Sequence, residues 1–279
     1  MRSGAAPRAS NGAAVPAPAR AARSAVAEEA DPGAPAEPEL AAQIEPFDSF
    51  WEAPEDIERG YASFYRFYRV NYLPHLPVER GVRILVISCG PGYFVDMLGR
   101  HGYRMVTGID SDAGKVGPGQ RRGLACRQAR AFGFLATHPE AFDVIVCEQE
   151  LNHLTKQEMR VFLGRVRDSL SPGGTLIVHG LNGANPITGA EALAQNIDHF
   201  NTFTDYSLRQ VLRHAGFERI RVFPLHLYVF YRNPLNYVAW GLAATLELLF
   251  RAAFVLYGKS NRIFTKKIGA VCHKPGGAG

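Results

Sequence analysis

The stretch Arg83-Ile84-Leu85-Val86-Ile87-Ser88-Cys89-Gly90-Pro91-Gly92-Tyr93-Phe94 decides the fold of this 279-residue chain. Its apolar first half is typical of a buried strand, and the Gly-Pro-Gly segment predicts a tight turn. Residues 93–101 then repeat apolar side chains with helical spacing. Glycines let the backbone approach a ligand closely, and a helix start offers free N–H groups. The stretch therefore predicts a strand, a ligand-binding loop and a helix.

A second apolar segment, residues 106–110, ends in the carboxylate of Asp110, which lies 18 residues after Gly92. Nucleotide-binding α/β folds place an acid near this spacing, where it accepts hydrogen bonds from ribose hydroxyls. A dinucleotide-binding loop would have a third glycine where this chain has Val95. A nicotinamide-dependent oxidoreductase is therefore only a weak alternative.

The loop resembles that of class I S-adenosylmethionine (SAM)-dependent methyltransferases, whose pattern reads apolar-apolar-acid-apolar-Gly-x-Gly-x-Gly. Cys89-Gly90-Pro91-Gly92 fits its end, but Val86 replaces the acid and Ser88 replaces the first glycine. The resemblance implies an α/β, Rossmann-like fold with a seven-stranded sheet and helices on both faces. It also implies that the cofactor is SAM.

The same resemblance implies a set of ligand contacts. The expected cofactor-binding residues are Ser88, Gly90, Gly92, Asp110, Gln128 and Glu148. The glycines would pass under the methionine and ribose, and Asp110 would accept from the ribose hydroxyls. The family's acid that reaches the adenine amino group is replaced by Arg130, with Gln128 as the expected substitute.

The string His-x-x-x-Phe-Thr-x-x-Ser-Leu that begins at His199, with Ala-Gly-Phe at 215–217, narrows the resemblance. It is similar to a bacterial subgroup tied to cell-surface polysaccharide and lipid-linked sugar synthesis, which implies a sugar or glycolipid acceptor. A general base helps to methylate a hydroxyl, and histidine suits this role near neutral pH. We expect His199 and His153 to be catalytic, with His179 third; each is as readily interpreted as a structural histidine.

The departures from the family pattern support a second interpretation. Val86, Ser88 and Arg130 depart from the family pattern. Val86 cannot bind the methionine ammonium, and Arg130 would repel the positive sulfonium of the cofactor. Losing one charged hydrogen bond costs about 1.5–3 kcal/mol, so several such losses could abolish SAM binding. The alternative is a degenerate methyltransferase fold with weak or no SAM binding. It would act as a scaffold or binding partner of a membrane-bound glycan-synthesis complex.

Composition divides the chain into five parts. Residues 1–45 are rich in Ala and Pro and are expected to be a disordered tail, and residues 46–80 form an aromatic helical lid segment. Residues 81–235 form the SAM-binding core, 236–258 an apolar helix, and 259–279 the final strand with a basic tail.

The apolar segment 236–258 is long enough to span a membrane. Glu247 and Arg251 lie near its middle, where each charge is costly in hydrocarbon. A single crossing would also leave the last strand on the wrong side. We therefore expect an interfacial helix on the inner face of the membrane of a cytoplasmic protein. Docking on a partner or on a second copy, as in a homodimer, remains open.

Charge and cysteine content restrict the partners. The formal net charge is +5, and no pattern of interleaved basic and aromatic residues predicts nucleic-acid binding. The four cysteines have no metal-type spacing and are interpreted as small buried hydrophobic residues in a reducing compartment. No metal site is expected.

Overall fold

A computed structural model describes residues 54–226 and 234–276, all within one compact unit, Ala36–Gly279. The predicted tail at 1–45 and the beginning of the aromatic segment lie outside the described residues. The helices are α2 (Pro54–Asn71), the 3-10 turn η1 (Leu73–His75), α3 (Tyr93–Arg100), α4 (Ala113–Arg121), α5 (Ala131–Ala136), α6 (Glu150–His153), α7 (Lys156–Ser169), α8 (Gly189–Ala194), α9 (Asp205–His214) and α10 (Leu235–Leu256). The strands are β1 (Arg83–Ile87), β2 (Met105–Asp110), β3 (Cys126–Gln128), β4 (Phe142–Glu148), β5 (Leu170–Leu181), β6 (Glu218–Leu225) and β7 (Lys267–His273).

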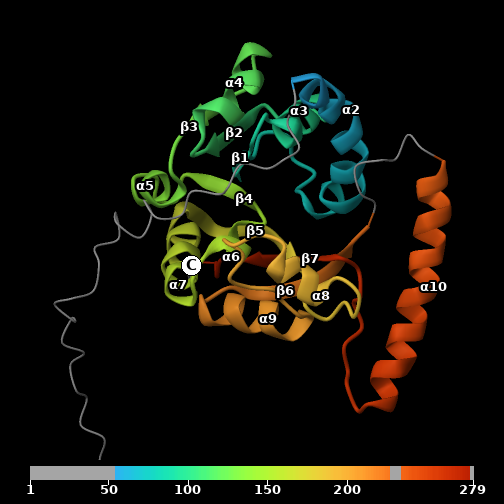
Figure 1. The fold of residues 1–279 in the computed structure, drawn as a ribbon. Helices are drawn as coiled ribbons and strands as arrows, with labels where there is room; N and C mark the ends of the chain where they lie inside the picture. The colour runs from blue at the N-terminus through green and yellow to red at the C-terminus, as the bar shows by residue number, and fades with distance from the viewer. Residues whose placement is uncertain (1–53, 227–233, 277–279) are drawn as a thin grey trace, which may run out of the picture. The chain divides into compact units, whose positions relative to one another are not determined.

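The seven strands form one sheet in the order β3-β2-β1-β4-β5-β7-β6 (Figure 1). The first five are parallel, whereas β7 is antiparallel to both β5 and β6. The predicted seven-stranded, Rossmann-like fold is confirmed, and the last strand does return to the sheet. Because the parallel strands share one direction, their carboxyl ends form one edge, where such folds bind ligands.

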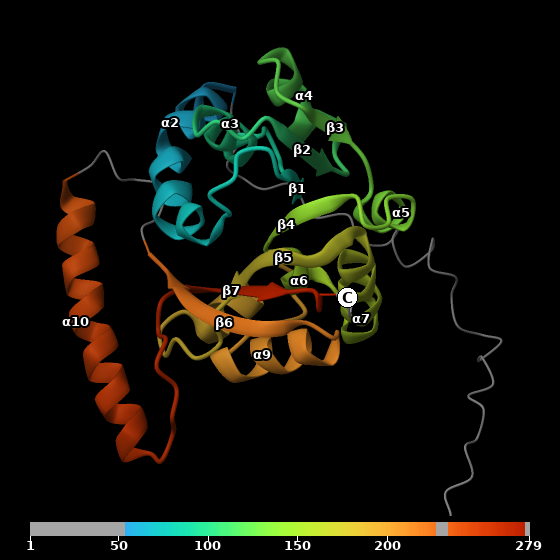
Figure 2. The same ribbon diagram turned by 180° about the vertical axis from the view of Figure 1, so that it is seen from behind.

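Each face of the sheet is covered by its own hydrophobic cluster. On one face, buried residues of α7 and α9, such as Phe162 and Leu208, pack against the strands. On the other, rings of α2 and α3 pack together; Tyr68 and Phe94 stack with centroids 4.6 Å apart. Figure 2 shows α2 and α3 close together and α9 along β6. The aromatic segment thus packs over the sheet with its buried rings, from Tyr61 onward.

Three local features lie where glycine, proline and polar residues favour loops and turns. Residues 111–124, whose glycines and proline permit only a loop or a short helix, contain the nine-residue α4. Asp112 caps it, accepting from the backbone N–H groups of Gly114 and Lys115. The polar segment 181–203 contains the short helix α8. The Pro-Gly-Gly turn at 172–174 lies within β5, where the pairing register with β4 shifts and Gly173 has a φ of 75°.

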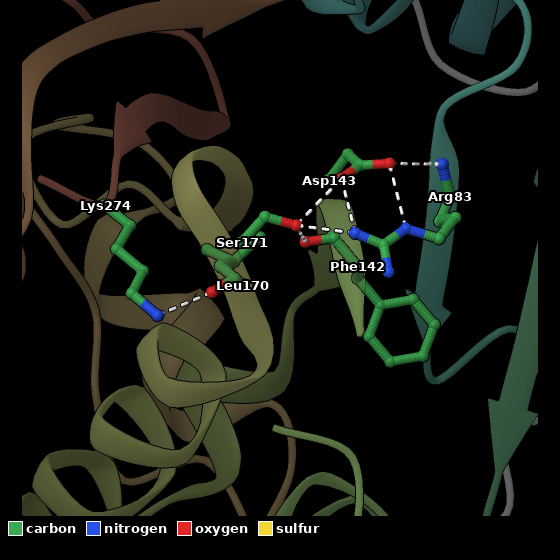
Figure 3. A network of polar contacts seen from close by, with 6 residues as sticks. All are labelled: Arg83, Phe142, Asp143, Leu170, Ser171 and Lys274. Atoms are coloured by element: carbon green, nitrogen blue, oxygen red, sulfur yellow. Dashed lines mark hydrogen bonds and ion pairs between the residues drawn. The ribbon is translucent and has the colours of Figure 1, made fainter. Parts of the chain in front are cut away.

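The amino ends of three strands are joined by a polar network, shown in Figure 3. Arg83 of β1 contacts both carboxylate oxygens of Asp143 on β4, and Ser171 of β5 donates to Asp143 at 2.8 Å. Nearby, the Lys274 ammonium donates to the carbonyl of Leu170 at 2.6 Å. Arg83 and Ser171 both hold the pKa of Asp143 well below its usual range, Arg83 more strongly. The network lies opposite the carboxyl edge and stabilises the sheet without taking part in the site.

The predicted apolar helix is present as α10, and its side chains are largely exposed. Its window Tyr237–Leu256 is long and apolar enough to cross a membrane, with a mean hydropathy of 1.6. Ring contacts hold it to the rest of the unit: Trp240 lies against His226, and Phe250 and Phe254 against the buried Phe264.

Candidate active site

The glycine loop after β1 has the backbone that a close ligand approach requires. Ser88, Gly90 and Gly92 all have positive φ angles, of 57°, 51° and 83°. A Cβ atom on Gly90 would meet nothing within 4 Å, so there is open space beside the loop. A Cβ on Gly92 would lie 2.7 Å from the Cys126 sulfur, so this glycine is required by packing as well as by φ. The loop therefore fits the cofactor-binding role predicted for it.

Asp110, at the end of β2, supports this loop directly. Its Oδ2 accepts a hydrogen bond from the Gly90 N–H at 2.9 Å, and its Oδ1 accepts from the Asp112 N–H at 3.0 Å. Each carboxylate oxygen has a second lone pair. Asp110 can thus anchor the loop and also accept from ribose hydroxyls, as predicted.

Ser88 explains one departure from the family pattern. It adopts the left-handed conformation that favours glycine, and its hydroxyl donates to a carboxylate oxygen of Glu150 in α6. Burial raises the pKa of Glu150, and the bond from Ser88 opposes this shift. The serine thus links the glycine loop to the helix that follows β4. The sequence gave no sign of this contact, because Ser88 and Glu150 are 62 residues apart in the chain.

The other departures lie in different surroundings. Val86 is buried, 1% exposed, among the residues packed beneath α2, so nothing polar is required there. Arg130 is exposed at the start of α5. Gln128, predicted to substitute for the adenine-binding acid, is exposed and its amide donates to the Ser111 carbonyl at 3.1 Å.

Glu148, at the end of β4, belongs to a group of buried and half-buried polar side chains under α2. The Tyr68 hydroxyl donates to its Oε2 at 3.2 Å, and Oε1 is buried without a hydrogen-bond partner. Burial raises the pKa of Glu148 to about 7, and burial lowers the pKa of Lys267 to about 8. The sequence gave no signal for Lys267, because it comes from the start of the last strand.

His179, the third histidine candidate, lies in this same group. Its Nδ1 is hydrogen-bonded to the Tyr72 hydroxyl, and its Nε2 is buried without a partner. Burial holds the pKa of His179 well below its usual range. With 2% of its surface exposed, this histidine serves packing under α2 rather than proton exchange with solvent.

The two preferred histidines, His153 and His199, do come together. Their ring centroids are 4.9 Å apart, and His153 Nδ1 lies 2.9 Å from an Asp198 carboxylate oxygen. His199 Nδ1 is 2.7 Å from the Ala192 carbonyl, to which it must donate. Burial lowers the pKa of His153, while Asp198 raises it. We call His153, Asp198 and His199 the His–Asp–His cluster; the sequence did not reveal that Asp198 would face His153.

Asn152 positions this cluster. It is fully buried; its side chain donates to the Asn201 carbonyl at 2.6 Å and accepts from the Leu181 N–H at 3.2 Å. An ionised carboxylate at this position could not donate to that carbonyl. The amide joins α6, the end of β5 and the loop that carries His199.

Comparison with known proteins identifies the family to which the chain belongs. A family described as "Methyltransferase domain" matches residues 55–222. A ubiquinone biosynthesis O-methyltransferase of Saccharophagus degradans is 26% identical over 54% of this chain and 69% of its own length. A protein of the same name from Azorhizobium caulinodans is 32% identical over 50% of this chain, which spans only 60% of that relative.

Solved structures show the same fold. A SAM-dependent methyltransferase from Archaeoglobus fulgidus has a TM-score of 0.56 at 13% identity and covers 77% of this chain and 94% of its own. Phosphoethanolamine N-methyltransferase 2 from Haemonchus contortus, solved with SAM, has a TM-score of 0.57 at 14% identity, over 82% and 59% of the two chains. The family match spans more than half of the chain, which favours the enzyme over a degenerate scaffold. The chain belongs to the methyltransferase-domain family and is a SAM-dependent methyltransferase.

Proposed function

We propose that this enzyme O-methylates a sugar or glycolipid hydroxyl at the membrane surface, and that the His–Asp–His cluster takes up the acceptor's proton. One observation carries the proposal. Glu150 contacts the cofactor loop through Ser88, and His153 contacts Asp198, one helical turn further along α6. Residues three apart lie on one side of a helix. The cluster therefore lies about one turn, roughly 5 Å along the helix axis, from a residue that touches the loop.

The cofactor, when bound, supplies a methyl group that is already electrophilic, so the protein must align the acceptor and remove its proton. His199 is suited to this because its Nδ1–H donates to the Ala192 carbonyl. In the neutral ring, Nε2 then keeps its lone pair. Asp198 stands beside His153 and would stabilise a positive charge on that ring.

The oxygen acceptor is supported by the names of the curated relatives, which are O-methyltransferases. The sugar is supported by the string that begins at His199, with its resemblance to the polysaccharide-linked subgroup. A second candidate acceptor is an intermediate of ubiquinone biosynthesis, favoured by those same relatives.

A membrane location is supported by α10 and its connections. The strands β6 and β7 pair with each other, with Leu225 opposite Lys267, so the excursion to α10 begins and ends at one place on the sheet. If α10 crossed the bilayer, the polar segment 257–266, which includes Lys259 and Arg262, would have to cross back. A helix lying along the interface avoids this cost.

The surface of α10 agrees with that orientation. Its exposed large side chains include Val238, Trp240, Leu242, Leu246, Leu248, Leu249, Val255 and Leu256. Trp240 and Tyr257 lie near opposite ends of the helix, as expected of amphipathic rings at a membrane interface. Exposed Lys259 and Arg262 follow directly and are suited to anionic lipid headgroups. These features support a location at a membrane surface, and we propose that this surface is the cytoplasmic, inner face.

The acceptor is tested with SAM carrying a tritiated methyl group, offered separately with a lipid-linked sugar fraction, a water-soluble glycan fraction and a ubiquinone precursor. We expect label in the lipid-linked sugar, recovered as an O-methyl sugar after hydrolysis. The variant His199→Ala should lose most of this transfer, whereas His214→Ala, exposed at the end of α9, should retain it. Label only in the ubiquinone precursor, or on nitrogen, would overturn the sugar proposal.

The membrane contact is tested by flotation with vesicles of phosphatidylcholine alone or mixed with phosphatidylglycerol. The protein should float with the anionic vesicles, and Leu242→Gln, Leu246→Gln and Leu249→Gln together should abolish this. Val78→Gln, also exposed but distant in sequence, is the control. If the triple variant instead changes only the sedimentation mass, α10 contacts a second copy of the chain and the membrane proposal fails.

A further inference from the structure

We propose that the His–Asp–His cluster is a binding site for a divalent transition-series cation such as Zn²⁺. This deepens the proposed function, and rests on it only for the role of the cation in removing the acceptor's proton. It also revises the sequence-based expectation of no metal site, which considered cysteine spacing alone.

The geometry brings three suitable ligand atoms together. His153, Asp198 and His199 each offer one, and these atoms all lie within 4.8 Å of one another. An ion about 2.0–2.2 Å from each ligand holds neighbouring ligands roughly 3–4 Å apart, so small side-chain rotations close the site. The side chains of His153 and Asp198 are 20% and 14% exposed, which shields the site but leaves it open on one side.

Two atoms in the cluster lack the partners that burial requires. His153 Nδ1 and Asp198 Oδ1 are both buried without a hydrogen bond. His153 Nδ1 approaches Asp198 Oδ2 to 2.9 Å, but that contact lacks the alignment of a hydrogen bond. Leaving a buried polar atom unsatisfied is destabilising. A cation between the two side chains would satisfy both.

The contacts outside the cluster are those of a ligating histidine. Such a ring usually donates its second N–H to a carbonyl or carboxylate, which fixes the tautomer. His199 does so through Nδ1 to Ala192, and its Nε2, which accepts a long contact of 3.4 Å from the Asn196 amide, would be the ligand atom. The backbone carbonyl of Asn152 accepts from the N–H groups of Phe200 and Asn201, which fixes the loop just after His199 against α6.

The donor set indicates which cation and which role. Two imidazoles and one carboxylate favour Zn²⁺, Co²⁺ or Ni²⁺ over Mg²⁺ and Ca²⁺, which prefer oxygen ligands. Three protein ligands leave at least one coordination position open, as in catalytic zinc sites. With His199 Nε2 bound to the cation, the acceptor's proton would pass to water instead of to the histidine, which replaces that step of the proposed function. The cation would favour this by lowering the pKa of a hydroxyl bound at the open position.

The test uses the full chain, freed of metal by dialysis against a chelator and titrated with Co²⁺. We expect visible absorption bands of Co²⁺ bound to nitrogen and oxygen ligands, saturating at one ion per chain. Zn²⁺ should displace them at equal concentration, whereas millimolar Mg²⁺ should not. Asp198→Asn and His199→Ala should each weaken binding at least tenfold. The controls His138→Ala and His214→Ala should bind as the unaltered protein does.

The outcomes separate this inference from the proposed function. Specific Co²⁺ binding without transfer to any hydroxyl acceptor would support the cation site and overturn the proposed function. Methyl transfer that continues in the metal-free protein, with no Co²⁺ bands, would overturn the cation site and leave the function standing. Co²⁺ absorption bands that persist in the variant His199→Ala, whose fold is verified by circular dichroism, would also overturn the cation site.

Discussion

The Gly90 backbone N–H donates a hydrogen bond to the Asp110 carboxylate at 2.9 Å, so the acid at the end of β2 holds the glycine loop at the end of β1. The same carboxylate accepts from the Asp112 N–H at the start of α4. One side chain therefore fixes the relative positions of two strand ends and remains able to bind a ribose. Disturbing it should affect the ligand and the loop together.

Replacing Asp110 should therefore weaken SAM binding. Loss of a charged hydrogen bond costs about 1.5–3 kcal/mol, which predicts that Asp110→Ala raises the dissociation constant for SAM about 10- to 100-fold. Calorimetric titration with SAM and with its demethylated product measures this, with the exposed Asp168→Asn as control. Absence of binding to the unaltered, folded protein at millimolar SAM would restore the degenerate-scaffold interpretation.

Ser88 combines a strained backbone with a favourable contact, and two substitutions separate the effects. Ser88→Ala removes the hydrogen bond to Glu150 but keeps a Cβ atom at a φ of 57°. Ser88→Gly removes both the bond and the steric strain. Because the left-handed region costs a non-glycine residue about 1 kcal/mol, the glycine variant should be more stable than the alanine variant by about that amount. Urea unfolding of both variants measures the difference, and equal stabilities would contradict it.

Glu148 should make stability fall as pH rises through the acid range. Its pKa is raised to about 7, mainly by burial, from the ordinary 4.5. Between these values the folded protein retains a proton that the unfolded chain has lost, so unfolding becomes easier as pH increases. Glu148→Gln should flatten the curve between pH 4.5 and 7 and add on the order of 2–3 kcal/mol at pH 7.5. Urea unfolding across this range tests it.

Lys267 should act in the opposite sense at higher pH. Its pKa is lowered to about 8 from 10.5, mainly by burial. Between pH 8 and 10.5 the unfolded chain binds a proton that the folded protein has lost, so stability should rise with pH across that window. Lys267→Met should remove the rise. A rise that is unchanged in this variant would assign the effect to another group.

Asn152 should act as a positioning residue. Its alanine variant leaves the Asn201 carbonyl and the Leu181 N–H without their side-chain partner, which should cost about 2–4 kcal/mol of unfolding free energy. Because the loop that carries His199 is then less well held, kcat should fall with little change in the dissociation constant for SAM. Asn185 is also a loop asparagine: its side chain accepts from the Ile187 N–H and donates to the Phe264 carbonyl. The variant Asn185→Ala is therefore the matched control for losing an asparagine in a loop. An equal loss of SAM affinity would show general disruption.

Local sequence chemistry predicted several elements well. The capping box at Thr155 and Glu158 fixes the start of α7, because both of its hydrogen bonds form within four residues. Helix propensity is a weaker guide in α4, which contains three glycines and Pro118. There the N-cap Asp112 stabilises the start of the helix despite these poor helix formers. The short α8 has no side-chain cap at its start, so no local signal in the sequence marks where it begins.

By itself, the sequence determined the order of the strands along the chain, the glycine loop with Asp110, and the two histidines of the cluster. These depend on apolar periodicity and on residues that act within one turn of chain. Only the tertiary structure decided that Asp198 faces His153, that Ser88 reaches Glu150, and that the half-buried Lys267 lies near Glu148. Such pairs join strand ends and loops distant in sequence, so they exist only after the sheet has brought its carboxyl edge together.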